Sequence, residues 1–118
     1  MDQAIVACST PPGRGAISVV RISGKEVKRI INNLFSLEFD HGTSKVAETS
    51  LSEEFNEKCL ISCFEGPSSY TGEDVAEISC HGNPLIVRAL IQKCIELGAR
   101  NANPGEFTQR AFLNNKID

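Results

Sequence analysis

Residues 16–22 read AISVVRI, a run in which branched apolar side chains dominate. Such a run favours a strand, because β-branched side chains fit the pleated surface of a sheet and are crowded in a helix. A loop with two prolines and two glycines precedes it at residues 10–15. Both residue types interrupt helices and strands, so this loop sets where the strand begins. The run therefore predicts a central strand of a sheet.

Further strands and three helical segments are expected along the chain. Strands are predicted at residues 4–9, 44–51, 57–64 and 74–81, with polar turns between them. A helix is predicted at residues 25–35, and Ser23 with Glu26 has the spacing of a capping box before it. A second helix should begin after Asn83, with Pro84 in its first turn, and stop at Gly98. A short last helix is expected at residues 107–113, where Phe107 and Phe112 could pack while Arg110 and Lys116 stay solvated.

The order of these elements indicates an α+β domain. The predicted order is two strands, a helix, three strands, a helix and a last helical segment. This order predicts a mixed sheet of about five strands with two or three helices. The 118 residues are enough for one domain around one core. Lys116-Ile117-Asp118 closes the sequence without a polar tail, so we expect a piece of a longer protein. A small protein that ends there is the alternative.

Composition and motifs exclude several functions. The formal net charge of −3 argues against a surface that binds nucleic acid through phosphate contacts alone, although a local basic patch is compatible with it. No apolar run approaches the ~18 residues of a membrane span. The dipeptide Gly24-Lys25 is followed by Glu26, so the sequence contains no P-loop for GTP. The five cysteines lack C-x-x-C spacing, which predicts reduced, buried thiols of a cytosolic protein and no metal site.

Two charged residues lie inside predicted strands. Arg21 shares its strand face with Ile17 and Val19, and Glu77 shares its face with Val75 and Ser79, because side chains alternate across a strand. Charges among apolar side chains must be paired, hydrated or turned toward a cavity. One interpretation is structural, either an Arg21–Glu77 salt bridge or two exposed charges at sheet edges. The other is a polar pair inside a ligand pocket.

Three sequence blocks carry a resemblance to a known family. The first is Thr10-Pro11-Pro12-Gly13-Arg14-Gly15-Ala16-Ile17 with Val20-Arg21-Ile22-Ser23-Gly24. The second is Gly66-Pro67 with residues 70–78 and His81-Gly82. The third is Pro104-Gly105-Glu106-Phe107-Thr108 with residues 110–114 and Lys116-Ile117-Asp118. In this order the blocks resemble the amino-terminal domain of the MnmE/TrmE tRNA-modification GTPases.

The resemblance implies a fold and a function. The family's amino-terminal domain is similar to the tetrahydrofolate-binding domain of the glycine-cleavage T-protein, and it binds a one-carbon folate and holds a homodimer together. The residues that match the family's folate contacts are Arg21, Glu77 and Lys116. Tyr70, in a loop dense in turn residues, is a further candidate because its ring could stack on a flat ligand. Which cation faces which part of the folate is left open.

The resemblance also implies a larger protein. Residues 1–118 would be the folate-binding and dimerisation domain, followed by helical and GTPase domains that use GTP, Mg and K. The folate would be 5-formyl-tetrahydrofolate or 5,10-methylene-tetrahydrofolate. Together with a flavin-dependent partner subunit of the MnmG/GidA type, such a cytoplasmic protein modifies the wobble uridine of tRNA.

Two other functions remain as alternatives. The chain could be an interaction protein whose polar strand residues are only structural, in which case it would have no affinity for folate. It could also be a free-standing aminomethyl transferase of the glycine-cleavage type, although such chains are much longer.

Overall fold

A single mixed sheet organises the part of the chain that the computed structural model describes, residues 3–11 and 13–117. Within these residues the sheet has six strands in the order β3-β4-β5-β2-β1-β6. They are β1 (Ile5–Cys8), β2 (Ile17–Ser23), β3 (Ser44–Ser52), β4 (Phe55–Phe64), β5 (Val75–His81) and β6 (Arg100–Asn101). The β1–β6 pair is parallel and the other pairs are antiparallel, so the predicted α+β domain with a mixed sheet is confirmed.

The predicted central strand is β2, which lies between β5 and β1. The five predicted strands form within two residues of the expected bounds. The sixth strand, β6, was not expected, because its two residues are too few to show an alternating pattern. It forms because residues 100–102 run beside β1, where the Arg100 and Ala102 amides donate to the carbonyls of Ala4 and Val6.

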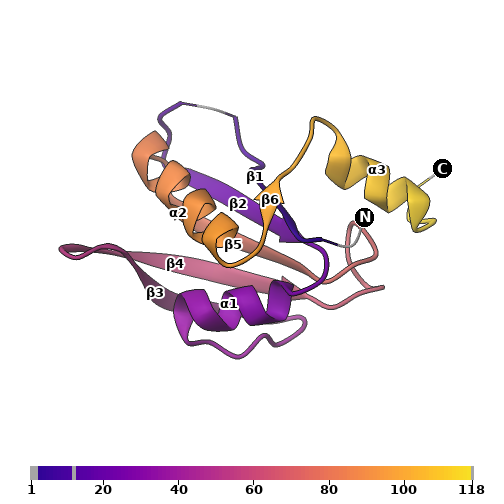
Figure 1. Cartoon of the computed structure of the whole chain (residues 1–118), viewed down its shortest axis with the longest axis horizontal. Coiled ribbons are helices and arrows are strands. Elements are labelled where there is room, and N and C mark those ends of the chain that lie inside the picture. The colour runs from indigo at the N-terminus through magenta and orange to yellow at the C-terminus, as the bar shows by residue number, and fades with distance from the viewer. Residues whose placement is uncertain (1–2, 12, 118) are drawn as a thin grey trace.

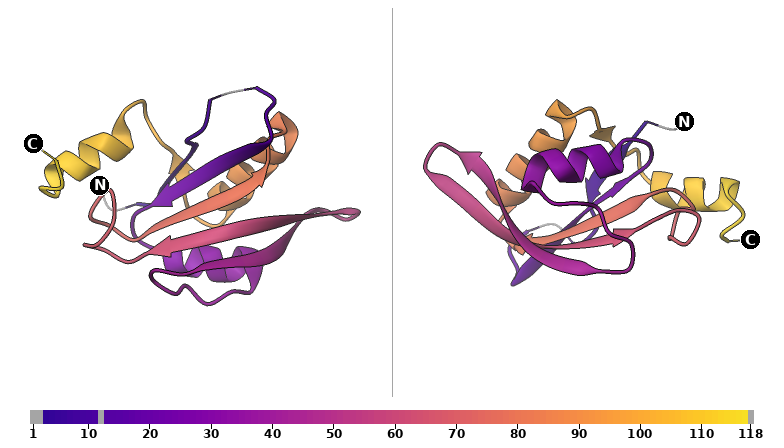
Figure 2. Two further views of the ribbon diagram at one scale, coloured as in Figure 1. Left: turned by 180° about the vertical axis from the view of Figure 1, so that it is seen from behind. Right: turned by 90° about the horizontal axis from the view of Figure 1, so that it is seen from below.

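Helices α1 (Val27–Phe35) and α2 (Pro84–Glu96) cover the same face of the sheet, as the two views of Figure 2 show. The core lies between them and the strands. On the helix side it contains Ile30, Ile31, Leu34, Leu90 and Cys94, all buried. The expected start of α2 is confirmed, because the Asn83 side chain accepts the Leu85 amide at 2.8 Å and Pro84 follows it.

The predicted capping box of α1 is wrong. The helix begins at Val27, after Glu26 in a left-handed conformation (φ 72°), and no side chain caps it. The Ser23 hydroxyl contacts Thr71 instead, at 2.7 Å. Ser23 is the completely buried last residue of β2, so tertiary partners in the loop of residues 65–74 satisfy its hydroxyl before the helix can.

The other face of the sheet carries neither α1 nor α2. At one end of it lie the loop of residues 65–74 and α3 (Glu106–Leu113), near the chain's C-terminus (Figure 1). The five cysteines are free thiols, four of them buried. Burial raises the pKa of the Cys94 thiol to about 12. No helix in the described ranges is long and apolar enough to cross a membrane.

Candidate functional site

Arg21 and Glu77 are directly opposite each other on the neighbouring strands β2 and β5. The Arg21 Nε donates to Glu77 Oε2 at 2.9 Å, and Nη2 lies 2.8 Å from the same oxygen. Val20 and Ile22 on either side of Arg21 point into the core, so Arg21 points to the face without α1 and α2. The side chains keep 26% and 31% of their exposure. The Arg21–Glu77 salt bridge of the structural interpretation is therefore present, and it lies on an accessible face of the sheet.

Two aromatic rings flank the Arg21 guanidinium. Its Cζ lies 5.4 Å from the ring centre of Tyr70 and 5.6 Å from that of Phe107. Both distances are in the range of cation–π attraction. The Tyr70 hydroxyl is also 2.9 Å from Thr108 Oγ1, which ties the loop of residues 65–74 to α3. Arg21 thus connects a strand, a loop and a helix that are far apart in the sequence.

Lys116 contacts the same loop of residues 65–74. Its Nζ donates to the Pro67 carbonyl at 2.9 Å. The loop is also close to the chain after α3 at Gly72, where a Cβ would lie 2.8 Å from Asn114 Cβ and 3.4 Å from Lys116 Cγ. The structure therefore brings the Lys116 side chain to the loop backbone, and the Arg21 side chain to the ring of Tyr70 in that loop.

Arg110 and Phe112 of α3 do not lie where the sequence predicts, and the contact of Phe107 with Arg21 was not anticipated. Arg110 was expected in solvent, but only 4% of its side chain is exposed, because it pairs with Glu73 at 3.1 Å. Phe112, expected to pack, is 56% exposed. The Glu106–Arg110 spacing of four residues is typical of an ion pair along a helix, and it was the available signal.

Glu106 stabilises the start of α3. Its carboxylate accepts from Arg100 Nη1 at 2.8 Å and Nη2 at 2.5 Å, and from the Asn103 amide at 2.9 Å. These bonds, the pair with Arg100 first, lower the pKa of Glu106 to about 2. The carboxylate therefore stays ionised although it is largely buried.

A second polar cluster lies at the opposite end of β5. The buried carboxylate of Glu57 accepts the His81 amide at 2.9 Å and lies 2.7 Å from His81 Nδ1. The His81 ring is 73% exposed. Glu57 therefore holds both the backbone and the ring of His81 at the end of β5.

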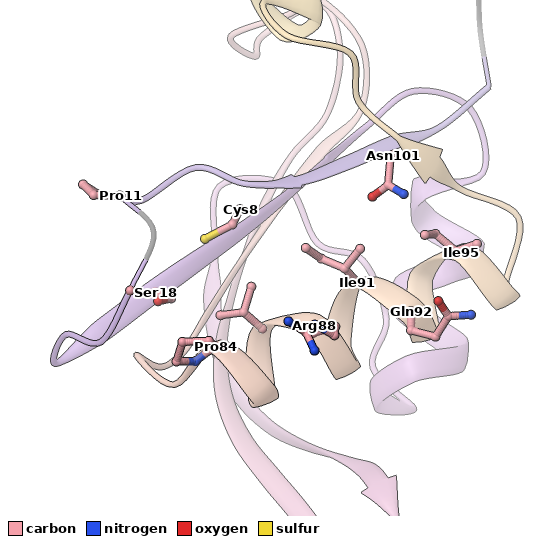
Figure 3. Close-up of a pocket in the computed structure, with 11 residues that line it drawn as sticks. Cys8, Pro11, Ser18, Pro84, Arg88, Ile91, Gln92, Ile95 and Asn101 are labelled. Atoms are coloured by element: carbon pink, nitrogen blue, oxygen red, sulfur yellow. The ribbon is translucent and has the colours of Figure 1, made fainter.

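Two hollows of the surface lie near these elements. The first, about 390 Å³, lies between α2 and the strands β1 and β2, and is bordered by Cys8, Arg88 and Ile91 (Figure 3). It is on the side of the sheet that α2 covers, away from the exposed face of the Arg21–Glu77 pair. The second, about 450 Å³, is bordered by the loop residues Gly66, Pro67 and Gly72, beside the contact of Lys116.

Comparison with known proteins gives a consistent result along the chain. The family model described as "GTP-binding protein TrmE N-terminus" matches residues 4–116. A protein named tRNA modification GTPase MnmE from Helicobacter pylori (strain Shi470) is 44% identical over the whole chain, which covers 26% of that relative. Proteins of the same name from Francisella philomiragia and Thermotoga petrophila are 45% and 41% identical over 97% of the chain, covering 25% and 26% of the relatives.

The chain spans about a quarter of the length of these relatives. The three sequence blocks of the resemblance fall almost entirely within the matched residues 4–116 and contribute every element of the site: β2, the loop of residues 65–74, β5 and α3. The chain therefore belongs to the family of TrmE N-terminal domains.

Proposed function

We propose that this domain binds a one-carbon tetrahydrofolate, of the 5-formyl or 5,10-methylene type, at Arg21, Glu77 and Lys116. It does so as part of a longer GTPase that modifies the wobble uridine of tRNA. The observation that carries the proposal is the Arg21–Glu77 pair on the accessible face of the sheet, flanked by Tyr70 and Phe107.

Glu77 provides the polar recognition. Both contacts with Arg21 use Oε2, and Oε1 has no hydrogen bond to any residue in the described ranges. A carboxylate accepts from two adjacent donors of a planar group, and a pterin ring offers such a pair, an N–H beside an NH₂. The free oxygen and the partial exposure leave Glu77 able to accept from such a ligand.

Flat aromatic surface and positive charge complete the site. Tyr70 is 46% exposed, so one part of its ring is open to a stacking partner. Arg21 and Lys116 are the two cations available to the anionic glutamate tail of a folate. Lys116 is exposed and donates to the carbonyl of Pro67, a neutral acceptor that leaves the charge uncompensated in that contact.

The longer protein supplies the rest of the activity. It forms a homodimer through this domain, works in the cytoplasm with a flavin-dependent subunit of the MnmG/GidA type, and meets tRNA in that complex. GTP, Mg and K belong to its GTPase domain, and the present chain, without a P-loop, is inactive alone. Exposed Ile17, Val46 and Leu60 on the face without α1 and α2 support a dimer surface, because a second copy would cover them.

Calorimetric titration with 5-formyl-tetrahydrofolate tests the proposal. The wild-type chain should bind, and Glu77→Gln should weaken binding about ten- to a hundredfold, because a charge-assisted hydrogen bond contributes about 1.5–3 kcal/mol. Glu96→Gln, at an exposed carboxylate on α2, is the matched control and should bind normally. An intact wild-type fold without measurable folate affinity would instead support the interaction-protein alternative.

A further inference from the structure

Arg110 is the feature of α3 that the proposed function does not use. It lies in a helix of eight residues, and only 4% of its side chain is exposed. Arginine is rarely buried to that extent unless it is paired. Its Nη1 donates to both carboxylate oxygens of Glu73, at 3.1 and 3.2 Å.

Glu73 extends this contact to the sheet. Its Oε1 also accepts the hydroxyl of Ser23 at 2.8 Å, and Ser23 is the last residue of β2. The same hydroxyl lies 2.7 Å from Thr71 Oγ1. A buried chain of hydrogen bonds therefore runs from the end of β2 through Glu73 to Arg110 in α3. Because such networks are rigid when every member is bonded, this one sets where α3 stands relative to the sheet.

The position of α3 matters for the Arg21 site. Phe107, three residues before Arg110, holds its ring 5.6 Å from Arg21 Cζ. Residues three apart in a helix share a side, so the bond from Arg110 to Glu73 and the contact from Phe107 to Arg21 are made by neighbouring parts of one helix surface. Thr108 in the same turn bonds the Tyr70 hydroxyl. Both aromatic side chains around Arg21 thus depend on the placement of α3.

We propose that Arg110, through Glu73, is a positioning residue for the folate site, which rests on the function proposed above. It fixes the spacing between the Tyr70 and Phe107 rings and the Arg21–Glu77 pair, and it acts through these side chains. The Arg110–Glu73 pair thus has two roles. One is the stability of the domain, and the other is the placement of the Tyr70 and Phe107 rings beside Arg21.

A pair of variants separates these roles. Arg110→Met leaves the Glu73 carboxylate buried without its cation and should lower the melting temperature strongly. Arg110→Met with Glu73→Gln removes both charges, while the new amide carbonyl can still accept from Ser23. This double variant should regain most of the melting temperature. Its folate affinity should remain about two- to thirtyfold below wild type, since cation–π contacts of about 0.5–2 kcal/mol are misplaced.

The readouts are calorimetric folate titration, thermal melting and the fluorescence of Tyr70. Tyr70 is the only tyrosine and the sequence has no tryptophan, so this emission reports the loop directly. It should change in the double variant even without ligand. Arg88→Met, at an exposed arginine of α2, is the control and should match wild type in all three.

The outcomes distinguish the two proposals. A double variant that melts like wild type and binds folate with wild-type affinity overturns the positioning role. If the wild-type chain binds no folate, the proposed function fails. The positioning claim is then decided by nuclear Overhauser contacts between the Phe107 ring and the Arg21 side chain, which should be lost in the double variant. Contacts that persist there overturn it.

Discussion

Gly82 packs against Gly15 so closely that a Cβ on residue 82 would lie 2.3 Å from the Gly15 carbonyl oxygen. The two residues also exchange a backbone hydrogen bond, from the Gly15 amide to the Gly82 carbonyl, at 3.0 Å. This contact joins the loop before β2 to the turn after β5. It explains why a glycine stands at the end of the second sequence block.

Gly82→Ala should therefore destabilise the domain. The new methyl group meets backbone atoms, which cannot rotate away, so overpacking of about 1–3 kcal/mol is expected. Chemical denaturation measures the loss of stability. Gly13→Ser would be a poor control, because Gly13 has a φ of 101° and a side chain would be strained there. Gly15→Ala is the better control, since a Cβ there has open space. Equal stability of Gly82→Ala and wild type would show that the two loops separate readily.

Glu57→Gln should lower stability and free the His81 ring. The carboxylate accepts both the amide and Nδ1 of His81, and a glutamine that turns its NH₂ toward them leaves a buried donor unpaired. A loss of about 1–3 kcal/mol is expected from unfolding curves. Glu54→Gln, in the exposed turn between β3 and β4, should have no effect. Folate affinity should also be unchanged, because the cluster is at the other end of β5 from Glu77.

The stability of the domain should fall in acid through Glu106. Its pKa is about 2 in the folded protein and 4.5 in the reference state, so the unfolded chain binds the proton first. The stabilisation is complete above about pH 4.5 and is lost as the pH falls toward 2. Unfolding curves at several pH values should show this decline. In Glu106→Gln, which is less stable at neutral pH, the decline should be smaller. An equally steep decline in that variant would assign the acid sensitivity to other carboxylates.

Arg21→Gln should separate binding from folding. The pair with Glu77 is partly exposed and such pairs contribute about 0.2–1 kcal/mol, so the unfolding free energy should change little. Folate affinity should fall at least tenfold, because the variant loses the cation and the group that orients Glu77 Oε2. A large loss of stability with unchanged affinity would return the pair to a purely structural role.

Leu60→Asp should weaken self-association if the face without α1 and α2 is the dimer surface. Leu60 is 42% exposed on β4, so the substitution removes little from the core. Light scattering over a concentration series should show a dimer for wild type and a shift toward monomer for the variant. Leu85→Asp, at a more exposed leucine on α2, is the control. A wild-type chain that stays monomeric at high concentration contradicts the proposed dimer.

The sequence was informative where one local pattern decides the structure. Three such patterns depend only on neighbours in the chain: the branched run of β2, the Asn83-Pro84 start of α2, and the apolar spacing of α1 and α2. These elements were predicted close to their observed bounds. The Arg21–Glu77 opposition could be proposed because both residues stand on strands with clear alternation.

Features that depend on tertiary partners could not be predicted. The Ser23 hydroxyl could be expected to cap α1, because the start of that helix is its neighbour in the sequence. Only the fold shows that it bonds Thr71 and Glu73 instead. Arg110 resembled a solvated helix residue because Glu73, its main partner, is 37 residues away. The contact of Phe107 with Arg21 likewise requires the loop, β2 and α3 to be assembled.

The parallel pairing of β6 with β1 has a consequence for synthesis of the protein. It joins Ile5 to Arg100 directly before α3, and α3 then brings Phe107 to Arg21. Contacts between residues so distant in the chain form late, because a long loop must close first. During synthesis β2 and β5 leave the ribosome before α3, so the contact of Phe107 with Arg21 can form only after α3 has followed. A nascent chain that stalls before α3 would already contain the strands of the described sheet, but Arg21 would lack its contact with Phe107.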